Sequence, residues 1–94
     1  MSIRIQSIDF KATDDLLEFV NEKVGKLFGM TNDIIRADVT LFLESKGNLE
    51  NKSCRIQLLI PGNDHVVEKN TMSFEASVLE CVDVLQKLIR RAKD

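Results

Sequence analysis

The sequence predicts an α+β fold with the element order β-α-β-β-β-α, in which a four-stranded mixed sheet carries two roughly parallel helices on one face. Two observations lead to this fold class. Two long segments have apolar residues at helical spacing, and four shorter segments alternate apolar and polar residues as strands do. The 94 residues match the length of one compact domain, so residues 1–94 are expected to form a single domain.

The alternating segments place four strands. The first is expected at residues 2–8, where Ile3 and Ile5 alternate with Arg4 and Gln6. The second is expected at residues 35–44, the third at 54–60 and the fourth, which is less regular, at 65–72. Turn signals at residues 46–48 and 61–64 separate the last three strands. The expected buried side of the second strand is Ile35, Ala37, Val39, Leu41 and Leu43.

The helical segments carry apolar stripes that begin after capping residues. Thr13 is an N-cap candidate for a helix at about residues 14–29, and Asp14 and Asp15 stand in its first turn, where the helix dipole favours acidic groups. Ser73 is the corresponding candidate for the last helix. The first stripe is Leu16, Val20, Val24, Leu27 and Phe28, and the second is Phe74, Val78, Val82, Leu85, Ile89 and Ala92.

The expected topology gives the charge pattern a direction. A strand-helix-strand unit favours parallel strands and a right-handed crossover, and the two short turns make the remaining strands antiparallel neighbours. Both helices then run the same way, so their C-termini meet at one end of the domain. Each helix has acidic residues early and basic residues late. The domain is therefore expected to have an acidic end and a basic end, the latter formed by Lys23, Lys26, Lys87, Arg90, Arg91 and Lys93.

Two interpretations of this polarity are open. Acidic residues at helix N-termini and basic residues at C-termini complement the dipole of any stable helix, whatever its function. The net charge of -2 and the absence of Trp and Tyr also weigh against a general RNA-coating protein with stacking platforms. Binding to a partner with a phosphate backbone requires that the basic residues be separated from the acidic ones. The expected topology separates them.

Nothing in the sequence predicts an enzyme, a metal site or a cofactor. His65 is the only histidine, and no Cys or Ser is placed by sequence to pair with it. Cys54 and Cys81 lack metal-ligand and redox-pair spacing and are expected to be reduced core residues of a cytoplasmic protein. No signal peptide or transmembrane segment and no small-molecule site is expected, and the free protein is expected to be a monomer.

Several short motifs resemble those of one protein family across nearly the whole chain. They are IRIQSI at 3–8, LLEFV at 16–20, KVGKL at 23–27, IPGND at 60–64 and SFEA at 73–76, followed by a long amphipathic helix with basic residues at its end. In order and spacing they resemble the ribosome hibernation-promoting factors, also called ribosome-associated inhibitors or sigma modulation proteins. The length of the chain favours a short form of this family.

The resemblance implies a double-stranded-RNA-binding-like fold and a function without catalysis. Such proteins insert into the mRNA and tRNA channel of the small ribosomal subunit and silence translation during stationary phase or stress. The resemblance implies that ribosomal RNA is bound by the late basic residues of both helices, which are Lys23, Lys26, Lys87, Arg90, Arg91 and Lys93.

The chain departs from the family pattern in its basic residues. The family's first helix usually continues into further lysines and a tyrosine, whereas residues 28–32 here carry no charge, and the last helix lacks a longer basic tail. Fewer phosphate contacts predict a shallower salt dependence of RNA binding. The alternative is a protein-interaction module of the same fold that does not bind RNA.

Overall fold

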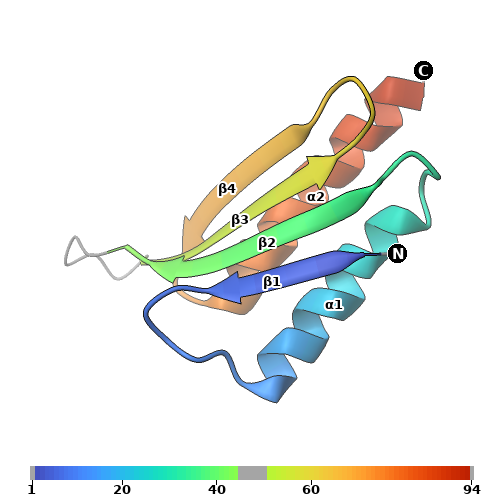
Figure 1. Cartoon of the computed structure of the whole chain (residues 1–94). Coiled ribbons are helices and arrows are strands. Elements are labelled where there is room, and N and C mark those ends of the chain that lie inside the picture. Colours follow the sequence, from blue (N-terminus) through green and yellow to red (C-terminus); the bar gives the residue numbers. More distant parts are fainter. Residues whose placement is uncertain (1, 45–50, 94) are drawn as a thin grey trace.

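The computed structural model describes residues 2–44 and 51–93, with side chains described as far as residue 91. In chain order the elements are β1 (Ile3–Ser7), α1 (Asp14–Phe28), β2 (Arg36–Leu43), β3 (Lys52–Leu59), β4 (His65–Thr71) and α2 (Phe74–Lys93). They form a four-stranded sheet in the order β1-β2-β3-β4, and both helices cover one face of it (Figure 1). The predicted fold class and element order are confirmed. The turn expected at residues 46–48 lies outside the described residues.

The strand directions agree with the predicted topology. β1 pairs with β2 in parallel, with Ile5 opposite Val39, whereas the β2–β3 and β3–β4 pairs are antiparallel. The chain therefore crosses over between β1 and β2 through α1, and it reaches α2 only after β4 has run parallel to β2. As a result α1 and α2 point the same way, and their C-terminal ends lie at the same end of the molecule (Figure 1).

Both helices begin at the predicted capping residues. The Leu16 amide donates a hydrogen bond of 3.2 Å to Thr13 Oγ1, and the Ala76 amide donates one of 3.1 Å to Ser73 Oγ. Each side chain thus satisfies a backbone donor that has no partner within its own helix. The helix ends agree with the sequence prediction to within one residue for α1, which stops at Phe28.

The hydrophobic core lies between the helices and the sheet. Val20, Val24 and Leu27 of α1 and Val78 and Leu85 of α2 are fully buried. On the sheet, the fully or almost fully buried apolar side chains are Ala37, Val39, Leu41, Cys54, Ile56 and Leu58. The predicted apolar stripes therefore cover the sheet, except that the side chain of Ala92, predicted in the second stripe, lies outside the described residues.

Two residues of the predicted buried strand face are exposed instead. Ile35 is 61% exposed and Leu43 is 44% exposed. Ile35 precedes β2, at a level where β1 no longer flanks the strand, because the β1–β2 pairing starts at Ala37. Leu43 is the last residue of β2, beyond the final β1 partner of that strand at Leu41. Strict alternation therefore overestimated the buried face by one residue at each end.

Polar contacts attach α2 to the sheet beneath it. Ser77 is buried, and its Oγ donates a hydrogen bond of 2.5 Å to the Lys52 carbonyl. One helical turn later, Cys81 Sγ donates to the Cys54 carbonyl at 3.3 Å. Cys54 and Cys81 are free and buried, as the sequence predicted, although the fold brings the two thiols together. A hydrogen bond with Cys81, and then burial, raise the pKa of the Cys54 thiol above its ordinary value.

The turn between β3 and β4 has the backbone of a type II β-turn. The Asn63 amide donates to the Ile60 carbonyl at 3.1 Å, with Pro61 and Gly62 at the two central positions. Gly62 has a φ of 87°, in the left-handed region that favours glycine. The Asp64 carboxylate closes the turn, because its Oδ1 accepts a hydrogen bond of 3.2 Å from the Ile60 amide.

Replacing Gly62 with Ala is therefore expected to lower the free energy of unfolding by about 1 kcal/mol, because a Cβ disfavours this backbone conformation. Gly29 provides a matched control: its φ is -77° and an added Cβ would meet only the Lys26 carbonyl, at 3.5 Å. The variant Gly29→Ala should lose no stability. Chemical denaturation of both variants measures the difference, and equal losses would show that the turn backbone is not the cause.

Candidate nucleic-acid interface

The late turns of both helices and two loops gather at one end of the molecule. Figure 1 shows the C-terminal ends of α1 and α2 beside the α1–β2 connection and the β3–β4 turn. We call this part of the surface the basic end and define it by the six predicted residues, Lys23, Lys26, Lys87, Arg90, Arg91 and Lys93. The opposite end carries the helix N-termini with Asp14, Asp15 and Glu75.

Three basic side chains have the clearest access to a partner. Lys26, Arg90 and Arg91 are exposed, and none of them forms an ion pair with another described residue. Arg90 and Arg91 stand next to Ile89, which is buried in the core and holds this turn of α2 against the sheet. Their guanidinium groups are therefore carried on a firmly packed helix while the groups themselves reach solvent.

Lys87 lies in an exposed ion pair. Its Nζ is 3.1 Å from Asp83 Oδ2, one helical turn earlier, and the two side chains are 63% and 61% exposed. Such pairs contribute less than about 0.5 kcal/mol to stability, since water and salt screen them. A phosphate group can therefore replace Asp83 as the partner of Lys87 at little cost.

Lys23 has a different environment from the other predicted residues. Its side chain is 24% exposed, and its Nζ lies 5.6 Å from the centre of the Phe19 ring and 3.6 Å from Glu22 Oε1. The aliphatic part of Lys23 thus packs along α1, and its ammonium group has a cation–π partner. Lys23 contributes to the packing of α1, which its spacing alone did not indicate. Lys93 belongs to α2, but its side chain lies outside the described residues.

A hollow of about 250 Å³ opens at the same end and was not anticipated from the sequence. Three segments far apart in the chain form it: the α1–β2 connection, the β3–β4 turn with the start of β4, and the last part of α2. Its lining residues are Thr31, Asp33, Ile60, Pro61, Asn63, His65 and Ile89. His65, which the sequence left without a role, is one of them.

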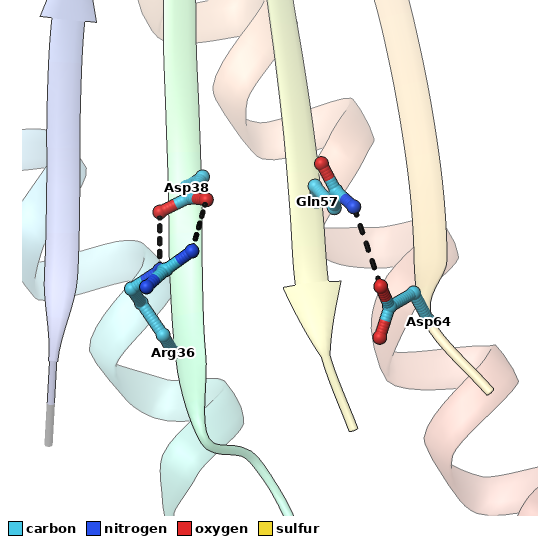
Figure 2. A network of polar contacts seen from close by, with 4 residues as sticks. All are labelled: Arg36, Asp38, Gln57 and Asp64. Atoms are coloured by element: carbon cyan, nitrogen blue, oxygen red, sulfur yellow. Dashed lines mark hydrogen bonds and ion pairs between the residues drawn. The ribbon is translucent and has the colours of Figure 1, made fainter. Parts of the chain in front are cut away.

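The open face of the sheet is polar. Arg36 and Asp38 of β2 form a bidentate ion pair, with Arg36 Nε 2.9 Å from Asp38 Oδ1 and Nη2 3.2 Å from Oδ2 (Figure 2). This pair neutralises the one acidic side chain in a shallow depression of about 520 Å³ on that face. The depression is lined by Arg4, Ile5, Gln6, Asp38, Val39, Thr40, Arg55 and Gln57.

Among residues 2–44 and 51–93, no cluster of His, Cys, Asp and Glu side chains is arranged to bind a metal ion. In the same ranges, neither helix has an apolar run long enough to cross a membrane. The chemistry that the basic end offers is instead the binding of anionic groups by lysine ammonium and arginine guanidinium groups, of which arginine suits phosphate in a bidentate geometry.

The different environments of Lys87 and Lys23 lead to a prediction about stability. Lys87→Gln should change the free energy of unfolding by less than about 0.5 kcal/mol, because it removes only an exposed pair. Lys23→Gln should cost more, about 0.5–1 kcal/mol, because it removes the contact with Phe19. Urea denaturation of both variants tests this. A larger loss for Lys87→Gln than for Lys23→Gln would assign Lys87 to the structure instead.

Comparison with known proteins is consistent with this geometry. The N-terminal domain of Thermus thermophilus Protein Y superposes with a TM-score of 0.81 at 25% identity, covering 97% of this chain and 98% of that one. A ribosomal subunit interface protein from Coxiella burnetii shares the fold, with a TM-score of 0.85 at 14% identity over 99% and 98% of the two chains.

A curated relative, the ribosome hibernation promotion factor of Deinococcus radiodurans, is 30% identical over 84 residues, which are 88% of this chain and 44% of the relative. The chain thus spans about half the length of that protein. Residues 3–94 match the family described as Sigma 54 modulation protein / S30EA ribosomal protein. This match confirms the resemblance noted in the sequence, and the chain belongs to that family.

Proposed function

We propose that this chain binds the small ribosomal subunit through ribosomal RNA and silences translation from the mRNA and tRNA channel during stationary phase or stress. The observation that carries the proposal is the common direction of α1 and α2, which brings the basic residues of both helices to one end. Lys26, Lys87, Arg90 and Arg91 are exposed there. On this proposal the protein acts in the cytoplasm, as a monomer when free.

The family supports the proposal. It is non-enzymatic, in agreement with the prediction that this chain is not an enzyme. The Deinococcus radiodurans relative is named for ribosome hibernation, and this chain matches 88% of its own length to that protein. The proposal extends that role to this chain and assigns the docking to its basic end.

The overall negative charge does not oppose binding at the basic end. Glu75 in the first turn of α2 and Arg90 near its end lie about 22 Å apart along the helix axis, at about 1.5 Å per residue. At physiological ionic strength the Debye length is about 8 Å, so charges at that separation are largely screened from each other. A phosphate group at Arg90 is therefore influenced by the local charge far more than by the net charge of -2.

The negative C-terminal ends of the helix dipoles alone do not cancel the positive charge of the basic residues at this end. Two helix C-termini contribute about half a negative charge each, or about one in total. Lys26, Arg90 and Arg91, which have no acidic partner among the described residues, already exceed this. The basic residues therefore exceed what the helix dipoles require, and the positive charge that they offer a partner lies on the helix ends, whereas the neighbouring loops carry Asp33 and Asp64.

The first test is co-sedimentation with purified small ribosomal subunits in a sucrose gradient at low and moderate salt. The protein is expected to travel with the subunits at low salt and to be released as salt rises, because each phosphate contact releases counterions. Protein that stays at the top of the gradient in low salt would contradict the proposal. Co-sedimentation that is insensitive to salt would favour the protein-interaction module instead.

A charge-reversal experiment tests the assignment of the basic end. Arg90→Glu with Arg91→Glu should abolish co-sedimentation and leave the protein folded, with a loss of about 1–2 kcal/mol in the free energy of unfolding from the reversed interaction with the helix dipole, because both side chains are exposed. The matched control is Arg4→Glu with Arg55→Glu, which changes the net charge equally but on the open face of the sheet. Equal loss of binding in both variants would contradict a localised interface and indicate attraction to the protein as a whole.

A further inference from the structure

The hollow at the basic end is lined by both apolar and polar side chains. Ile60, Pro61 and Ile89 provide the apolar surface, and Ile89 directly precedes the exposed Arg90. The polar lining residues are Thr31, Asp33, Asn63 and His65. At about 250 Å³ the hollow is smaller than the sites of about 300–1,000 Å³ that hold drug-sized ligands, so it suits a single flat ring system.

Hydrogen bonds hold the walls of this hollow in place without a ligand. Two of these hydrogen bonds were described above: the Ile60–Asn63 turn bond and the bond from the Ile60 amide to the Asp64 carboxylate. The Asp64 carboxylate also accepts a hydrogen bond of 3.4 Å from Gln57 Nε2 (Figure 2). Asp64 therefore ties the turn to β3 and is occupied by protein donors. On the other wall, the Asp33 amide donates to Thr31 Oγ1 at 3.2 Å, and the Asp33 carboxylate has no hydrogen-bond or ion-pair partner among the described residues. The hollow is preorganised, and this lowers the entropic cost of filling it.

We propose that this hollow receives one unpaired guanine base of the RNA that docks at the basic end, an inference that rests on the function proposed above. Unpaired bases are the parts of RNA that proteins read by stacking and by hydrogen bonds to the base edge. The His65 ring and the apolar side chains of Pro61 and Ile60 offer surfaces for the face of a base. Arg90, next to Ile89 in the chain, carries a positive charge for the phosphate attached to that base.

The polar side chains of the lining favour guanine over uracil. The Asp33 carboxylate is a hydrogen-bond acceptor only, and its two oxygens match two adjacent donors. Guanine presents such a pair, N1–H and the N2 amino group, on its Watson–Crick edge. Uracil presents a single N–H between two carbonyl groups, which would face the carboxylate unfavourably. Thr31 Oγ1, which accepts from the Asp33 amide, keeps its own hydrogen free to donate to guanine O6.

The test uses NMR titration of the isotopically labelled chain with GMP, and with UMP as the comparison nucleotide. GMP is expected to shift the amide resonances of Thr31, Asn63 and His65 saturably, with a dissociation constant about tenfold lower than that of UMP. Asp33→Asn should abolish this preference, because it replaces one acceptor oxygen with a donor. Asp15→Asn at the acidic end makes the same chemical change away from the hollow and should preserve the preference.

Equal effects of GMP and UMP, or shifts restricted to Arg90 and Arg91, would overturn the guanine site, since they would indicate attraction of phosphate alone. Co-sedimentation with small subunits separates the two proposals. Subunit binding without a guanine preference would refute the hollow as a base site and leave ribosome docking intact. A guanine preference without subunit binding would support the site and refute the docking.

Discussion

The parallel pairing of β1 with β2 determines which end of each helix meets which end of the sheet. Parallel neighbours require a crossover, and the crossover through α1 places this helix on one face of the sheet, where it runs opposite to both strands. The antiparallel pairs that follow return the chain to the start of α2 on the same face. The two helices therefore end together, and so do the basic residues in their last turns.

This arrangement combines two roles that are usually regarded as alternatives. Within a single helix, late basic residues offset the negative C-terminal end of the dipole and stabilise the helix. When two such helices are parallel neighbours, the same residues form one positively charged surface. Arg90 and Arg91 can thus stabilise α2 through its dipole and also bind a partner. The two roles differ only in whether a partner is present.

Most of the fold could be predicted because its causes are local. Capping by Thr13 and Ser73, apolar stripes at helical spacing and the Pro61-Gly62 turn all act within a few residues. The features that escaped prediction depend on distant segments. The hollow is assembled from three parts of the chain, and Cys54 meets Cys81 only through packing of α2 on β3. Ile35 is exposed at a position before the β1–β2 pairing, which starts at Ala37. The spacing of apolar and polar residues along the sequence does not predict such contacts between distant segments.

The separation of acidic and basic ends also bears on how the free protein approaches a polyanion. The field of the polyanion exerts opposite forces on the two ends, which amounts to a torque that turns the domain before any contact is made. Encounters with Arg90 and Arg91 leading are then favoured, whereas those with Asp14 and Asp15 leading are repelled. A domain of net charge -2 can in this way select its orientation during diffusion, and a larger share of its collisions becomes productive.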